Sequence, residues 1–157
     1  MSETESKTVK IVDTLSFLLG QWTVERFLTD HRSGTDGRFE GSVSIAGTPS
    51  GQNAGLGPRA RYEEVGTMRF GRYVGPASRS LELVRLASTV VMLYFPDGKP
   101  FVDLDLRSGK WRSSHPCGED DHEILTVVRS PREIEEQWRV HGPTEDYDAI
   151  ATLRRLD

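Results

Sequence analysis

The sequence predicts an all-β protein: one antiparallel barrel of about 8–10 strands with a single short N-terminal helix. Two observations support this fold class. After Gly20, apolar and polar residues alternate with a period of two, as in strands that bury one face. Turn-forming Gly, Pro, Asp or Ser interrupts this alternation about every eight to twelve residues. A closed barrel is favoured because about ten strands in an open sheet would leave exposed edges, and a two-sheet sandwich is the alternative.

The predicted helix lies between Asp13, whose side chain can cap the first turn, and Gly20, a typical residue at a helix end. Its apolar residues are Leu15, Phe17, Leu18 and Leu19. A helix of about two turns is too short to be stable in isolation, so we expect it to pack against the barrel.

The strands are expected at residues 21–31, 37–46, 60–71, 78–86, 89–95, 100–106, 110–115, 122–129, 133–141 and 146–155. Asp97-Gly98 predicts a tight turn. The segment from Thr48 to Pro58 is either a mobile flap or a long hairpin connection. Because neither a repeat nor a linker divides the chain, we predict a flexible N-terminus over residues 1–12 and one barrel domain over residues 13–157.

Composition excludes several classes of function. The chain has 157 residues, of which 36% are hydrophobic and 28% charged, as in a globular domain rather than a disordered chain. The net charge is −4, and Lys and Arg are scattered among acids, which argues against nucleic-acid and membrane partners. The first ten residues are polar, and Cys117 is the single cysteine, so a cytoplasmic location is expected.

The alternation also places charged side chains on apolar faces, as Arg26 beside Trp22 and Glu64 beside Tyr62. The expected interior polar set is Arg26, Glu64, Arg79, His115, His122, Glu136, Tyr147 and Arg155. A lone buried charge costs several kcal/mol, so such groups are paired, hydrated or line a polar cavity. We favour a ligand pocket, and the alternative is a set of structural ion pairs such as Arg26 with Glu64.

The sequence therefore predicts that a small apolar or amphipathic molecule binds inside the barrel. The predicted ligand-binding residues are Arg26, Phe39, Tyr62, Met68, Arg79, Leu83, Met92, Glu136, Trp138 and Tyr147. Phe70 is expected to extend the apolar wall, and Glu64 to help orient the ligand.

Acid–base catalysis is a second hypothesis, with Glu64, His115, Asp120 and His122 as candidate catalytic residues. Burial on an apolar face predicts a raised pKa for Glu64 or Glu136. The alternative is that His115 and Asp120 brace a turn through hydrogen bonds. The residues from His115 to His122 have ligand types that suit zinc but match no standard spacing, so no metal site is predicted.

Haem is a further alternative, with His31, His115, His122 and His141 as the available histidines. His31 and His141 fall at strand ends, where a surface role is expected. No phosphate-binding or dinucleotide motif is present, so no cofactor is predicted. A homodimer is an open alternative to a monomer.

Gly20-Gln21-Trp22 after a short helix, with Arg154 and Arg155 in the last strand, resembles the lipocalin (calycin) signature. The resemblance implies a lipocalin-like barrel in which the Trp packs against an Arg and closes one end. Trp22 and its arginine are then structural residues.

From Leu19 to Arg155 the chain also resembles an uncharacterised lipocalin-like family that is classed as a domain of unknown function. The matching motifs are Leu19-Gly20-x-Trp22, Tyr62-x-Glu64-x-Gly66, His115-x-Cys117-x-x-Asp120 and Trp138-x-Val140-x-Gly142-Pro143-x-x-Asp146-Tyr147. His122 stands where that family has Tyr, Glu145 where it has Lys, and Arg79-Ser80-Leu81 where it has Arg-x-Tyr.

The family implies no agreed activity. Small barrels of this kind serve as cofactor-free cyclases and isomerases in natural-product biosynthesis, and by that analogy the chain is either a cofactor-free cyclase, isomerase or dehydratase, or a non-catalytic carrier.

Overall fold

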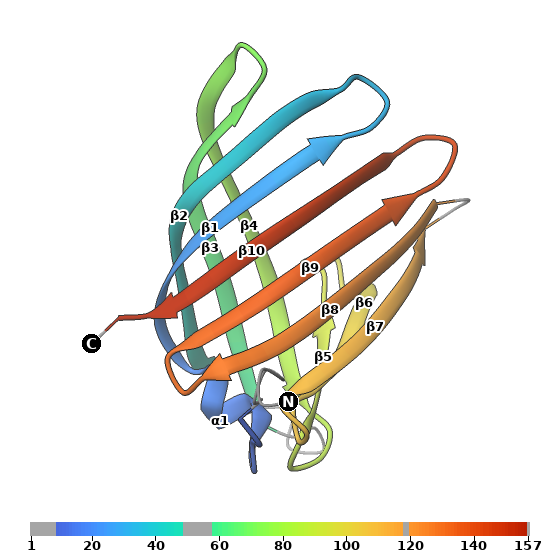
Figure 1. Ribbon diagram of the computed structural model, residues 1–157. Helices are drawn as coiled ribbons and strands as arrows, with labels where there is room; N and C mark the ends of the chain where they lie inside the picture. The colour runs from blue at the N-terminus through green and yellow to red at the C-terminus, as the bar shows by residue number, and fades with distance from the viewer. Residues whose placement is uncertain (1–8, 49–57, 118–119, 157) are drawn as a thin grey trace, which may run out of the picture.

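The computed structural model describes residues 9–48, 58–117 and 120–156, and it confirms the predicted all-β barrel (Figure 1). Within these residues, one helix, α1 (Thr14–Leu18), precedes ten strands. The strands are β1 (Gly20–Asp30), β2 (Thr35–Thr48), β3 (Arg59–Phe70), β4 (Tyr73–Arg85), β5 (Val90–Tyr94), β6 (Pro100–Asp105), β7 (Lys110–Cys117), β8 (Asp120–Ser130), β9 (Glu133–His141) and β10 (Asp146–Arg155).

All ten strands form one antiparallel sheet in the order β6-β5-β4-β3-β2-β1-β10-β9-β8-β7. The two-sheet sandwich considered as an alternative is therefore wrong. Each predicted strand is present. Strand β4 begins at Tyr73 rather than at residue 78, because its ladder with β3 continues through Gly75 and Pro76 to the pair Phe70 and Tyr73. The predicted loop Thr48–Pro58 lies, in its central residues 49–57, outside the described residues.

The barrel is nearly closed, but no ladder joins its edge strands β6 and β7 in the part of the chain that the structure describes. Side chains bridge these strands instead. Trp111 Nε1 donates to Asp103 Oδ1 at 3.3 Å. The ring of Phe101 lies edge-on to the ring of His115, with 5.5 Å between the centroids. We call this gap between β6 and β7 the split.

Helix α1 covers the lower end of the barrel in Figure 1, while the hairpins β1–β2, β3–β4 and β9–β10 extend from the other end. Asp13 caps the helix as predicted, because its side chain accepts a hydrogen bond from Ser16 N. The helix ends at Leu18, the following residue Leu19 is extended, and Gly20 already begins β1. Gly20 has φ of +131°, a conformation that favours glycine.

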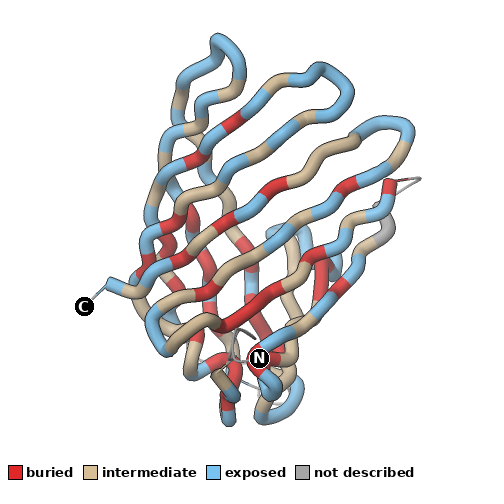
Figure 2. The backbone as a smooth tube through the Cα atoms, in the orientation of Figure 1, coloured by how far each residue is buried: buried red, intermediate tan, exposed pale blue. Residues whose placement is uncertain are grey.

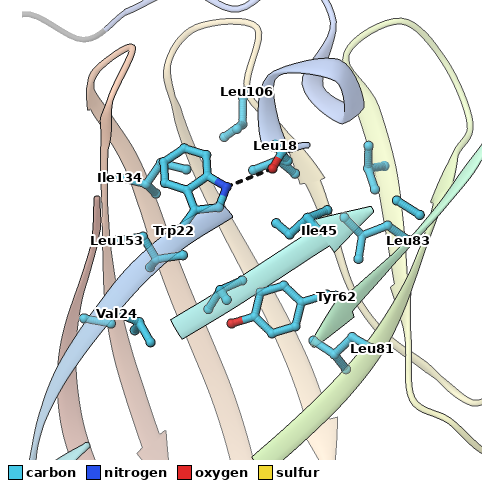
Figure 3. Packing of buried hydrophobic residues seen from close by; sticks show 14 of the residues in the cluster. Leu18, Trp22, Val24, Ile45, Tyr62, Leu81, Leu83, Leu106, Ile134 and Leu153 are labelled. Carbon is cyan, nitrogen blue, oxygen red and sulfur yellow. Dashed lines mark hydrogen bonds between the residues drawn. The ribbon is translucent and has the colours of Figure 1, made fainter. Parts of the chain in front are cut away.

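Trp22 closes the helix end from inside (Figure 3). It is fully buried, and its Nε1 donates to Leu18 O at 2.9 Å. The guanidinium of Arg155 lies 4.1 Å from the Trp22 ring centroid and donates to Leu19 O. The Trp–Arg contact implied by the lipocalin resemblance is thus present, and it ties the helix to the first and last strands.

Buried residues gather toward the helix end, whereas the hairpin tips at the open end are exposed (Figure 2). The apolar cluster contains Trp22, Leu83, Leu106, Ile134 and Leu153, among others. Within the described residues, no helix is both long and apolar enough to cross a membrane. The barrel therefore has a dry, apolar end beside α1, and its polar interior groups lie above it.

Candidate ligand-binding site

A cavity of about 50 Å³ lies inside the barrel, next to the split. Its lining residues come from strands β3 to β9 and are Tyr62, Arg79, Leu81, Leu93, Phe101, Val102, Leu104, Ser113, Ile124, Thr126, Glu136 and Trp138. A recess of about 170 Å³ at the open end is lined by Leu28, Phe70, Glu145 and Tyr147, among others. A further hollow, of about 400 Å³, is shallow and is lined largely by outward-facing side chains such as Arg112 and Ile150. The interior cavity brings together four of the predicted ligand-binding residues, which are Tyr62, Arg79, Glu136 and Trp138.

Arg26 and Glu64 form a buried ion pair with two hydrogen bonds, of 3.1 and 3.0 Å. Tyr62 donates its hydroxyl to Glu64 Oε1 at 2.6 Å. Burial alone would raise the pKa of the Glu64 carboxyl, but the hydrogen bond from Arg26 and the charge of Arg79 hold it below the usual value. The predicted raised pKa of Glu64 is therefore wrong, because its oxygens are already engaged. The ion pair named as an alternative to a free pocket charge is present here.

Arg79 is held differently from Arg26. Its guanidinium lies 5.6 Å from the ring centroid of Tyr62 and 5.4 Å from that of Trp138. Among the described residues its hydrogen bond is one long contact, 3.5 Å from Nη2 to Glu64 Oε1. Its Nε is buried without a hydrogen-bond partner in that same set. Arg79 is thus fixed by aromatic rings and retains unused donors.

Two buried hydroxyl groups face the same cavity. Ser113 and Thr126 are 5% and 4% exposed, and both line the cavity. Thr126 is directly opposite Glu136 in the ladder of β8 and β9. Glu136 accepts a hydrogen bond from Trp138 Nε1 at 3.2 Å. The Trp138 ring stacks on Phe101 with 5.9 Å between the centroids, which gives the cavity an aromatic wall.

His115 and His122 are opposite each other on β7 and β8, with ring centroids 5.8 Å apart. The His122 side chain is 14% exposed, and both of its ring nitrogens are buried without a hydrogen bond in the described part of the chain. Glu145 Oε2 lies 3.6 Å from His122 Nε2. His115 contacts the rings of Phe95 and Phe101. This histidine pair therefore lies between the aromatic wall and the open end.

Asp120 braces the β9–β10 connection. Its two oxygens accept hydrogen bonds from the backbone N and the hydroxyl of Thr144. The hydrogen bond from the Thr144 hydroxyl holds the pKa of Asp120 below its usual value. A Cβ at Gly142 would collide with the Asp120 carboxyl, so glycine is required for this close approach. Asp120 therefore has a bracing role, as the alternative proposed, but it holds the β9–β10 connection rather than the turn near His115.

The remaining predicted wall residues lie at different heights of the barrel. Phe39 is buried beneath Arg26, with 5.3 Å between the guanidinium and the ring centroid. Met68 is opposite Phe39 in the ladder of β2 and β3. Leu83 is 1% exposed and belongs to the apolar cluster. Tyr147 lines the recess at the open end.

Met92 does not line the cavity, contrary to the prediction. Leu93, which pairs with Leu83, lines the cavity, so Met92 points to the opposite face of β5. Val90–Tyr94 is continuously apolar or aromatic, and a period of two cannot be recognised in it. The sequence argument also missed Phe101, Ser113 and Thr126. The only signal for Ser113 was that it alternates in phase with His115.

Two of the histidines considered for haem lie on the outside. His31 and His141 are exposed and contact Asp148 and Asp146, at 2.8 and 3.0 Å. The hydrogen bond to Asp148 raises the pKa of His31. No group of three His, Cys, Asp or Glu side chains placed to hold a metal ion occurs in the described ranges.

The comparisons with known proteins place this barrel in context. No curated protein matches the chain in sequence. The S-type phycobiliprotein lyase CPES of Guillardia theta has a similar structure, with a TM-score of 0.69 and 10% identity over 91% of this chain and 90% of that one. A DUF3598-family protein of unknown function from Nostoc punctiforme has a TM-score of 0.62 and 12% identity. The match covers 99% of this chain and 54% of the Nostoc chain, about half its length.

These identities show a shared fold alone, that of a nearly closed antiparallel β-barrel. A family model matches residues 18–155, and the chain therefore belongs to the family of unknown function DUF6314.

Proposed function

We propose that the protein binds a small, largely apolar molecule inside the barrel, in the cavity beside Arg79 and Trp138. The observation that carries this proposal is a group of polar atoms in an aromatic-walled cavity: Arg79 Nε, which is buried without a hydrogen-bond partner among the described residues, and beside it the buried Ser113 and Thr126. Buried polar groups in proteins are almost always hydrogen-bonded, because an unpaired one costs about 1–3 kcal/mol. A bound molecule with a few hydrogen-bonding atoms would satisfy them.

The size of the cavity sets a condition on binding. About 50 Å³ has room for one or two water molecules, whereas ligand pockets usually measure about 300–1,000 Å³. A ligand therefore displaces water and moves a wall side chain, and Trp138, which is only partly buried, is the large ring beside the cavity. The likeness to a phycobiliprotein lyase concerns the fold alone, so the proposal rests on the cavity residues.

Filling the cavity should abolish binding. We expect Ser113→Leu to weaken binding of the fluorescent probe 8-anilinonaphthalene-1-sulfonate about tenfold or more, because the larger side chain occupies the ligand volume. Ser114→Leu is the matched control, since Ser114 is the next residue of β7 and is exposed. Native mass spectrometry of the freshly purified wild type and both variants, beside their denatured masses, tests for a co-purified ligand. Equal probe affinity in both variants, or no binding by the wild type in either measurement, would contradict the proposal.

Proton transfer to or from the bound molecule is a second candidate function. It is favoured by His122, whose nitrogens have no hydrogen bond within the described residues and whose neighbour Glu145 can orient the ring. Glu64, saturated by Arg26, is a poor candidate for the same role. A carrier would contain the same cavity without using His122.

The base-sensitive probe 5-nitrobenzisoxazole separates these two functions. His122 would remove the C3 proton as the N–O bond breaks, and the nitrophenolate product is followed by its absorbance. We expect His122→Gln to lower the rate about 100-fold, in the range of general-base contributions, while the exposed His31→Gln has no effect. Equal rates in the two variants would contradict a catalytic role of His122 and would favour a protein that only binds its ligand.

A further inference from the structure

The interior charges of the barrel are not equivalent. Arg26 donates two hydrogen bonds to Glu64, which also accepts from Tyr62. Each charge of this pair is matched, and the geometry is the bidentate one that guanidinium and carboxylate prefer. Arg26 and Glu64 therefore have little left to offer a ligand, although the alternation of the sequence marks them as strongly as Arg79.

Arg79 is the cation with unused capacity. A guanidinium has five N–H donors. Among the described residues, Arg79 Nε is buried without a partner, and Nη2 reaches Glu64 Oε1 only at 3.5 Å, with the Tyr62 hydroxyl as a further neighbour. The rings of Tyr62 and Trp138 flank it at 5.6 and 5.4 Å and hold it in place. Its side chain is 31% exposed, so the group can be reached. A rigid, accessible fork of donors beside an aromatic wall suits a planar anion.

Glu136 restricts which anion fits. It lines the same cavity as Arg79, and its carboxylate accepts from Trp138 Nε1 rather than from an arginine. A second negative charge on the ligand would be repelled across this small, poorly hydrated space, where Coulomb energies are larger than in water. The hydroxyls of Ser113 and Thr126 add neutral donors to the same wall.

We infer that the ligand carries one carboxylate, which Arg79 binds, and an apolar, conjugated body that packs against Trp138 and Phe101. This inference rests on the proposed function and names the chemical class of its ligand. A dianionic headgroup such as a phosphate monoester is disfavoured by Glu136. A neutral amide of the same shape lacks the charge-assisted hydrogen bonds to the guanidinium.

Three matched probes test this by isothermal titration calorimetry at pH 7.5: 2-naphthoate, 2-naphthamide and 2-naphthyl phosphate. We expect the wild type to bind 2-naphthoate about tenfold or more tightly than either of the others. Arg79→Met should remove the preference for naphthoate over naphthamide, and Arg79→Lys should retain part of it. Arg69→Met, which removes an exposed arginine from the outer face of β3, should leave it unchanged. Because the preference is a ratio within one protein, partial unfolding of a variant does not alter it.

Equal affinity of the wild type for naphthoate and naphthamide would overturn the inference and leave the proposed function standing. Naphthyl phosphate binding as tightly as naphthoate would overturn it too, as would a preference that survives in Arg79→Met. If none of the three probes binds, while cavity filling at Ser113 also changes nothing, it is the proposed function that fails.

Discussion

Trp22→Ala is expected to lower the free energy of unfolding by about 3–5 kcal/mol, the range for removing a large aromatic side chain from a packed core. Trp22 is fully buried, touches the Arg155 guanidinium and hydrogen-bonds the end of α1. The substitution therefore leaves a void and also removes the anchor of the helix. Urea denaturation followed by circular dichroism measures the effect through the midpoint and slope.

Two variants separate the parts of this expectation. Trp22→Phe keeps most of the packing and loses the hydrogen bond to Leu18 O, so it should cost less than alanine. Thr23→Ala, at an exposed neighbouring position of β1, should cost within about 0.5 kcal/mol. A loss below about 1 kcal/mol for Trp22→Ala would mean that the helix end contributes little to the stability of the barrel.

Glu64→Leu is the second substitution with a large expected effect, of about 3–5 kcal/mol of destabilisation, because it leaves Arg26 buried without its counter-ion. The double variant Glu64→Leu with Arg26→Met should recover much of that loss, since removing both charges avoids an unpaired one. A double-mutant cycle from urea denaturation gives the coupling energy. Additive losses would show that the pair is not coupled.

The pH dependence provides an independent check of the same pair. The pKa of Glu64 lies below its usual 4.5 in the folded protein, so Glu64 stabilises the fold above about pH 4.5 and this contribution is lost as the pH falls through the folded pKa. The wild type should therefore lose more stability than the double variant when the pH is lowered from 6 to 3. The same slope in both proteins would contradict a lowered pKa for Glu64.

Most of the strands could be predicted because they are long enough for alternation to appear, and because one face of each is either core or cavity. Strand β5, which is short and apolar throughout, is the exception. The same reasoning placed Arg26, Glu64 and Arg79 inside. It could not show which of the two arginines keeps free donors. That depends on which oxygen each guanidinium reaches, and so on neighbours on other strands.

Other parts of the site were beyond sequence reasoning for identifiable reasons. The side of β5 on which Met92 lies was predicted wrongly, because β5 is apolar throughout and its pairing with β6 shifts register between Met92 and Tyr94. Asp120 has the same chemistry whether it braces or reacts, and its partner Thr144 is 24 residues away in the chain. Phe101 became a cavity residue only because the sheet curls until β6 approaches β7.

The split between β6 and β7 bears on how fast the proposed ligand would enter and leave the barrel, rather than on its affinity. Parting these strands breaks the Trp111–Asp103 hydrogen bond and the ring contacts of Phe101 with His115, whereas parting any other neighbouring pair breaks a row of backbone hydrogen bonds. Local opening is therefore cheapest here, beside the cavity. Substitutions along the split would then raise the association and dissociation rates of the proposed ligand together. Its residence time would change while its equilibrium affinity stayed the same.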